Sequence, residues 1–256
     1  MACPDQRSVL GIASVAGFLT LWELGAAAGR VNVLFFSSPL RIAVAGLREV
    51  QQERFWQDVQ ASSIELFAGY AAAATLGVLL GLVVGWHQRL LFTLEPWLSF
   101  MYALPRVALF PLIVLWLGLT TWSTVTAVFV STLFTVVIGT LYGVGTVDAR
   151  LLDVAASFGA RRRNVFINLI VPTTLPFILS SLRLGVGQAL VGVVIGERYA
   201  ANAGIGVMML VAGQQLQTDR LLFAIGVCTG AGLLLIEGLR LLERRLLRWR
   251  PSVVSL

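Results

Sequence analysis

Residues 107–147 form a run of 41 residues without a single charged side chain. As one helix, this run would be about 60 Å long, which is twice the thickness of the hydrocarbon core of a bilayer. The run must therefore fold back on itself, and the Leu-Gly-Leu-Thr-Thr sequence at residues 117–121 is the most suitable turn. A chain that contains this segment is expected to cross a membrane at least twice.

The composition of the whole chain indicates the same class of protein. Apolar residues make up 57% of the 256 residues and charged residues only 12%. Soluble domains carry about 25% charged residues, whereas a surface that faces lipid can be apolar. We therefore expect an all-α polytopic membrane protein, with residues 1–256 forming one transmembrane domain.

A membrane span needs about 20 mostly apolar residues, and six such segments can be placed. They are residues 8–28, 63–86, 94–117, 122–142, 176–195 and 221–239. Pro105 and Pro111 predict kinks in the third span. In the polar segment 30–60, Ser38-Pro39 is a favourable helix start and apolar residues follow at helical spacing, which predicts an outer amphipathic helix on the membrane surface. A polar, glycine-containing loop is expected at residues 197–220.

An even number of spans places both termini on one side, and the arginines indicate which side it is. Eleven lie on the side of the termini and six on the other, so the termini and the 148–172 loop are expected in the cytoplasm. The eleven are Arg7, Arg89, Arg150, Arg161, Arg162, Arg163, Arg240, Arg244, Arg245, Arg248 and Arg250, and the six are Arg30, Arg41, Arg48, Arg54, Arg198 and Arg220.

Several kinds of chemistry are excluded because the chain has no Lys, so that all 19 basic residues are Arg. A phosphate-binding P-loop requires Lys, and so does a Schiff base. With one His and two Cys, we expect no catalytic triad, no metal site and no cofactor bound by this chain. The net charge of +6 is attributed to Arg-rich loops that face anionic lipid, and no nucleic-acid binding is expected.

Residues 153–172 read DVAASFGARRRNVFINLIVP. This loop resembles the EAA loop of bacterial ABC importer permeases, whose pattern is EAA, three residues, Gly, nine residues and I-x-L-P. Asp153-Val154-Ala155 stands for EAA, Gly159 for the Gly and Leu169-x-Val171-Pro172 for the end, so every spacing is kept. Over residues 37–251 the chain is most similar to the nitrate/sulfonate/taurine type of permease, notably at LPRVALFPLIVLWLG (104–118) and GERYAANAGIG (196–206). Glu65 is a departure, since this family often has Arg there.

The resemblance implies a methionine-importer-like permease fold in the bacterial plasma (inner) membrane. It implies four kinds of partner: a second copy of the chain, two ATPase subunits that bind ATP and Mg²⁺, an extracytoplasmic solute-binding protein and membrane lipid. The expected solute is small and anionic, with aliphatic sulfonate or taurine first, and nitrate, bicarbonate or a pyrimidine precursor still open.

Two other function classes predict different sequence patterns. An integral-membrane enzyme would show clustered His, Asp or Glu at the span ends. A stand-alone secondary transporter would show inverted repeats and an acidic residue at the membrane midplane. The sequence shows neither pattern.

The loop itself is predicted to be a docking element. Residues 151–158 can form a short helix with Leu152, Ala155 and Phe158 on one stripe, Gly159 ends it, and Arg161 begins a second helix. By the resemblance, the first helix seats on the ATPase subunit. The expected ATPase-coupling residues are Leu152, Asp153, Ala155, Ala156, Phe158, Gly159, Ala160 and Arg161.

Polar residues within the spans are candidates for the translocation path, because ionisable groups inside a membrane tend to face protein or water. The candidates are Pro105, Arg106, Arg183, Gln188 and Glu197. Arg106 and Arg183 either guide an anionic solute or snorkel to the cytoplasmic interface. Glu197 either contacts a partner or is solvated at a helix end, and Gln188 either lines the path or bonds to a neighbouring helix.

Overall fold

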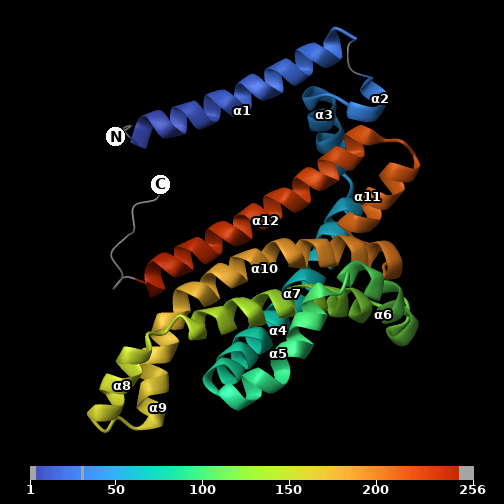
Figure 1. Cartoon of the computed structure of the whole chain (residues 1–256). Helices are drawn as coiled ribbons and strands as arrows, with labels where there is room; N and C mark the ends of the chain where they lie inside the picture. Colours follow the sequence, from blue (N-terminus) through green and yellow to red (C-terminus); the bar gives the residue numbers. More distant parts are fainter. Residues whose placement is uncertain (1–3, 30–31, 248–256) are drawn as a thin grey trace.

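The computed structural model describes residues 4–29 and 32–247, and every regular element in these residues is helical. Figure 1 shows the arrangement of the helices. The elements are α1 (Pro4–Ala27), α2 (Val33–Phe36), α3 (Pro39–Val50), α4 (Glu53–Trp86), α5 (Gln88–Ala103), the 3₁₀ turn η1 (Arg106–Leu109), α6 (Phe110–Leu117), α7 (Thr121–Gly145), α8 (Ala149–Ser157), α9 (Arg162–Val165), the π-helical turn η2 (Phe166–Ile170), α10 (Val171–Ala200), α11 (Ile205–Gln214) and α12 (Thr218–Leu246).

Five segments of the described chain are continuous helices, long and apolar enough to cross a membrane. They are Val9–Ala27, Glu53–Trp86, Thr121–Gly145, Arg162–Ala200 and Thr218–Leu246. Together with a broken pair between the second and third of them, they confirm the prediction of an all-α membrane protein with up to six spans. α4 begins well before the predicted residue 63, because its polar first turns bury Phe55 and Asp58 against other helices.

The expected third span is broken. Gln88–Ala103 and Arg106–Leu117 meet at an angle of 87°. The break lies at Leu104 and Pro105, where the proline has no N–H to donate and forces the preceding residue into an extended conformation. The kink predicted from the sequence is therefore an interruption of the helix. The predicted turn at 117–121 is present, and Gly118 adopts a positive φ of 76° there.

The most closely packed part of the fold consists of α4, α7 and α10, with α7 in contact with both of the others. Small residues allow these helices to approach, as is common between membrane helices. A methyl group built on Gly81 of α4 would lie 2.5 Å from Cβ of Thr140 on α7. On the other side of α7, a methyl group built on Gly192 of α10 would lie 2.8 Å from Cα of Val128, whose side chain is fully buried. Such contacts bring these three spans into close packing.

The segment between the first two long spans contains the predicted amphipathic helix. Ser38 caps α3, since its Oγ accepts a hydrogen bond from the N–H of Arg41 at 3.4 Å. One face of α3 exposes Leu40 and Leu47, and the other packs against the start of α12, where Gly46 lies against Phe223. Residues 30–31 of the predicted segment lie outside the described part of the chain.

The prediction of one polar loop over residues 197–220 is wrong, because most of this segment is helical. α10 continues to Ala200, and residues 205–214 form the short apolar helix α11. The start of α11 is held by side chains of α4 and α10. These contacts join distant parts of the chain, so the local sequence pattern did not predict the helix.

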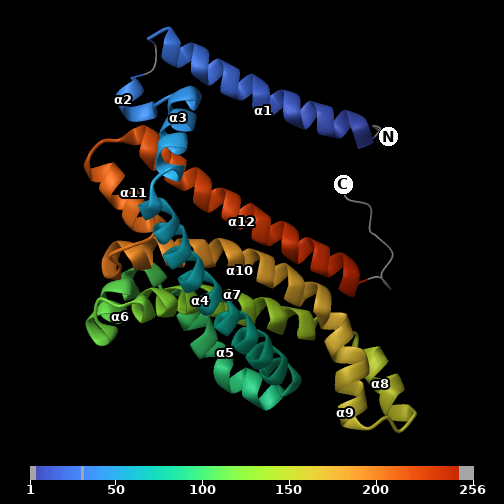
Figure 2. The ribbon, with the colours of Figure 1, turned by 180° about the vertical axis from the view of Figure 1, so that it is seen from behind.

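The N-terminal end of α1, the C-terminal end of α12 and the hairpin of α8 and α9 lie at the same end of the molecule, as views from both sides show (Figure 1 and Figure 2). α2, α6 and α11 lie at the opposite end. This arrangement is the one that an even number of crossings requires.

Candidate functional site

The hairpin of α8 and α9 is built from local signals in the sequence. Asp148 begins α8, since its Oδ1 accepts a hydrogen bond from the N–H of Arg150 at 2.9 Å. α8 ends in front of Gly159, which adopts φ = +66°. The N–H of Ala160 then bonds to the carbonyl of Ala155 at 3.0 Å, which closes the end of the helix. Arg161 precedes α9. The predicted helix–Gly–helix order is confirmed.

The exposed side of α8 is an apolar stripe. Leu151, Val154 and Phe158 recur at helical spacing and are 49%, 52% and 87% exposed. Leu152 and Ala155, which the sequence placed on the predicted stripe with Phe158, are half-buried. Exposed apolar surface at the tip of a projecting hairpin is typical of a protein-binding site. Leu151 and Val154 were missed as candidates, although their i, i+3, i+7 spacing with Phe158 was readable.

The base of the hairpin is joined to two long spans. The guanidinium of Arg162 lies over the ring of Trp86, at 5.4 Å from its centroid. Trp86 in turn contacts Phe166, with ring centroids 5.6 Å apart. Trp86 ends α4, and Phe166 begins the π-helical turn that leads into α10. A movement of α8 therefore has a packed connection to both α4 and α10.

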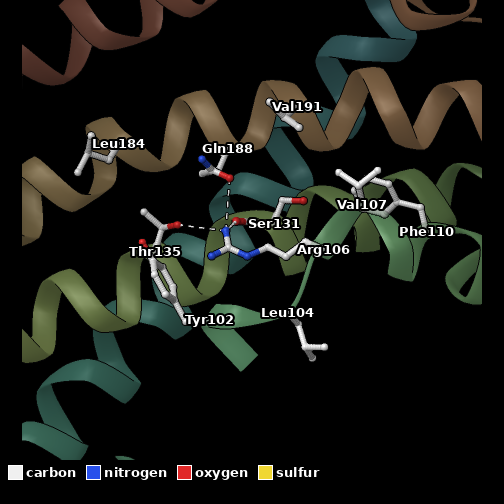
Figure 3. A pocket seen from close by; sticks show the side chains of 10 residues that line it. All are labelled: Tyr102, Leu104, Arg106, Val107, Phe110, Ser131, Thr135, Leu184, Gln188 and Val191. Atoms are coloured by element: carbon white, nitrogen blue, oxygen red, sulfur yellow. Dashed lines mark hydrogen bonds between the residues drawn. The ribbon is translucent and has the colours of Figure 1, made fainter. Parts of the chain in front are cut away.

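A second site lies at the break between α5 and α6 (Figure 3). Arg106 extends from the break, and its Nη1 donates to the carbonyl of Ser131 at 2.7 Å. The same nitrogen donates to Oε1 of Gln188 at 3.3 Å and to Oγ1 of Thr135 at 3.4 Å. The ring of Tyr102 lies 5.2 Å from the guanidinium carbon. The guanidinium is therefore fixed by contacts from α5, α7 and α10.

These contacts bear on the two interpretations of Arg106. Ser131 and Thr135 lie near the middle of α7, and Gln188 lies near the middle of α10. A side chain that snorkels would reach the end of a span, whereas this guanidinium is held at the depth of two span centres. The break in the third span places the Arg106 side chain beside the centres of these two helices, which favours the interpretation that it lines the path. The site lines an open cavity of about 480 Å³.

The other residues predicted to line the path lie at the edge of the Arg106 cavity or away from it. Pro105 forms the break beside Arg106 and is exposed. Arg183 forms an ion pair with Glu243 of α12 at 3.0 Å and bonds to Oγ of Ser180 at 3.2 Å. The structure brings Arg106 and Gln188 together and places Arg183 and Glu197 in separate environments.

Glu197 belongs to a buried polar cluster that holds the start of α11. Its side chain is 1% exposed, so the expectation of a solvated carboxylate is wrong. It accepts hydrogen bonds from Oγ of Ser62 and from the N–H of Gly206, both at 2.5 Å. Asp58 accepts from the N–H of Gly204 at 2.8 Å, and Ser62 accepts from the N–H of Ile205 at 2.8 Å. Three side chains thus satisfy the free N–H groups at the start of α11.

Glu65 is the fourth polar residue of this cluster and lies beside Glu197. It is 2% exposed, on the same face of α4 as Asp58 and Ser62. The i, i+4, i+7 spacing of these three residues was visible in the sequence, but nothing local connected them with Glu197. Within the described residues, no group of three His, Cys, Asp or Glu side chains is arranged to hold a metal ion.

Comparison with known protein families decides the identity of the fold. Residues 73–248 match the family of binding-protein-dependent transport system inner membrane components. The chain belongs to this family. The match includes the Arg106 cavity and the α8–α9 hairpin, and it begins after Asp58, Ser62 and Glu65 on α4.

Individual relatives of the permease carry more specific names. The taurine transport system permease protein of Escherichia coli (strain K12) is 32% identical over 98% of this chain and 93% of its own length. The putative aliphatic sulfonates transport permease protein of the same organism is 31% identical over 98% and 97%. The formylaminopyrimidine transport permease protein of Halalkalibacterium halodurans is 29% identical over 91% and 93%.

The family confirms the resemblance found in the sequence. The permease is a multi-pass protein of the bacterial inner membrane, as its apolar helices and its relatives indicate. Components of this family are normally non-catalytic, and they act in transport systems that depend on a binding protein and are driven by an ATPase.

Proposed function

We propose that this chain is the permease subunit of an ATP-driven importer, and that α8 is the element through which a separate ATPase chain drives it. The observation that carries the proposal is the exposed apolar stripe of Leu151, Val154 and Phe158. The stripe lies on a capped helix that projects from the spans within the EAA-like loop. In this proposal, the other predicted coupling residues, Asp153, Ala156 and Gly159 among them, shape the same surface. The hairpin and the termini then face the cytoplasm.

The assembly that fits this proposal has two copies of the permease around one path, two ATPase subunits that bind ATP and Mg²⁺, and an extracytoplasmic binding protein. Closure of the ATPase subunits brings the two α8 helices together. The contacts of Trp86 with Arg162 and Phe166 pass this movement to α4 and α10. The path then opens outward, the binding protein releases its solute, and ATP hydrolysis restores the inward-facing state.

The path of this importer runs past the cavity at Arg106 and Gln188, with Pro105 at its edge. The ion pair of Arg183 and the buried contacts of Glu197 favour structural roles for those two residues. The solute is small and carries an oxyanion group. The names of the taurine and sulfonate relatives make an aliphatic sulfonate the first candidate, and the formylaminopyrimidine relative supplies a neutral comparison.

The coupling surface is tested by purifying the permease together with its ATPase subunit. Phe158→Asp places a charge at the most exposed point of the stripe, and we expect the ATPase subunit to dissociate and its stimulated hydrolysis to fall to the level of the free subunit. Ser157→Ala is the matched control, because Ser157 is exposed on the same helix and bonds only to the carbonyl of Asp153 within the described chain. Retention of both association and stimulation by Phe158→Asp would show that α8 is not the docking element.

A further inference from the structure

The guanidinium of Arg106 is only partly used by the protein. All three of its hydrogen bonds come from Nη1, to Ser131, Thr135 and Gln188. Within the described part of the chain, Nε and Nη2 make no hydrogen bond. These two nitrogens form one edge of the planar guanidinium, and this edge matches two oxygens of a carboxylate, sulfonate or phosphate group.

The orientation of this edge is fixed before anything binds. The bond to the Ser131 carbonyl is the shortest of the three, and the Tyr102 ring supports the guanidinium from another direction. Figure 3 shows Gln188 and Thr135 converging on the same nitrogen of Arg106 from α10 and α7. A side chain held in this way loses little rotamer entropy when a ligand binds, which makes it a better receptor than a free arginine.

The polar groups of the cavity supply donors and no negative charge. Among the described residues that line it, none is acidic. Gln188 accepts the Arg106 bond with Oε1, so its amide nitrogen is left as a further donor. An isolated cation at the centre of the spans is costly, and a bound anion removes that cost. Leu104, Val107, Phe110, Leu184 and Val191 form an apolar wall beside the charge.

We propose that this cavity is a transit site for an oxyanion head group, bound through Nε and Nη2 of Arg106 and the amide of Gln188, with the short carbon chain of the solute along the wall. This proposal rests on the permease function proposed above and adds the atoms of the path that bind the oxyanion group of the solute. The break between α5 and α6 supports it, because interrupted helices within a membrane occur where the backbone lines a cavity. Lipid phosphate is a poor occupant, since the head groups lie about 15 Å from the membrane centre.

The test uses the permease reconstituted with its ATPase subunit and binding protein in phosphatidylcholine vesicles, with radiolabelled taurine as the probe. Arg106→Lys keeps the charge and removes the two-nitrogen edge. Gln188→Glu places a carboxylate beside the guanidinium, where it competes with the solute. We expect each variant to lower uptake by about tenfold or more, since hydrogen bonds to charged groups have that effect on an equilibrium. Stimulation of ATP hydrolysis by the binding protein should persist in both variants. Arg240→Gln is the control, because Arg240 is exposed on α12 and pairs with Glu237.

The outcomes separate this proposal from the broader one. If the wild-type assembly shows neither uptake nor stimulated hydrolysis, the proposed permease function fails. If the wild type transports taurine and Arg106→Lys and Gln188→Glu transport it equally well, the oxyanion site is refuted while the permease function stands. Uptake of a formylaminopyrimidine that survives Arg106→Lys, in an assembly that does not transport taurine, also refutes the oxyanion site. A repeat in vesicles with anionic phosphatidylglycerol is expected to leave uptake unchanged, and inhibition there that is absent in Arg106→Lys would assign the site to lipid.

Discussion

Gly204 offers a stringent test of the polar cluster that holds α11. Its backbone adopts φ = +139° and ψ = 160°, a region in which side chains other than glycine are strained by about 1–3 kcal/mol. A methyl group there would also lie 2.4 Å from the carboxyl carbon of Glu197. Gly204→Ala must therefore displace the Glu197 carboxylate from Ser62 and Gly206, in addition to straining the backbone.

The two contributions can be given rough magnitudes. The backbone strain is about 2 kcal/mol. Loosening two hydrogen bonds to a buried carboxylate adds about 2 kcal/mol, at about 1 kcal/mol for each bond. This value lies between those measured for hydrogen bonds in membrane proteins and for bonds to charged groups in soluble proteins. The sum of about 4 kcal/mol lowers the melting temperature by roughly 8–16 °C, at about 2–4 °C per kcal/mol for a chain of this size.

The assay is thermal unfolding of the purified permease in detergent, read by the fluorescence of its tryptophans. Gly213→Ala is the matched control, since Gly213 lies in α11, which Gly204 precedes, with open space around it, and the change should be neutral or slightly stabilising. In the Glu197→Ala variant, Gly204→Ala should lower the free energy of unfolding only by the backbone strain of about 2 kcal/mol. The close approach of Gly204 to Glu197 would be refuted if Gly204→Ala lowered the free energy of unfolding equally in the wild type and in the Glu197→Ala variant. It would also be refuted if Gly204→Ala had no larger effect than Gly213→Ala.

Three further predictions concern other parts of the fold. Gly81→Leu should prevent α4 from packing on α7 and abolish a monodisperse peak in size-exclusion chromatography, whereas Gly226→Leu, at a position with open space, should not. Trp86→Ala should leave the ATPase subunit bound but lower the number of solute molecules imported per ATP hydrolysed, and an unchanged ratio would exclude Trp86 from the transmission of movement. Glu49→Gln, which removes the 3.0 Å ion pair with Arg220, should lower the free energy of unfolding by about 1–3 kcal/mol, because both side chains are mostly buried and the guanidinium is left without its counter-ion. No measurable loss in thermal unfolding would show that the pair does not anchor α3.

Much of the topology could be predicted because each membrane span is a continuous run of apolar residues. The charge-free run at 107–147 required a turn, and the structure places that turn at Gly118. The docking hairpin was equally readable, since Gly159 and the spacing of the EAA-like loop are local features. In both cases, the determining interactions lie within a few residues of one another.

The candidate site was harder to predict because it depends on contacts between distant segments. Pro105 indicated a kink, but the depth of Arg106 follows from how α5 and α6 pack against α7 and α10. α11 was hidden for the same reason, since its first N–H groups are held by Asp58 and Ser62, more than 140 residues earlier in the chain. The spacing of polar residues on α4 was visible, whereas their partner was not.

The most direct test of the central claim is the uptake of radiolabelled taurine by vesicles that contain the permease with or without its ATPase subunit, each with the binding protein and ATP. We expect uptake only when the ATPase subunit and ATP are both present, because no phosphate-binding P-loop can be formed by a chain without Lys. We also expect Gly159→Glu to abolish that uptake by disrupting the end of α8. Uptake by the permease alone, driven by an ion gradient, would contradict the account.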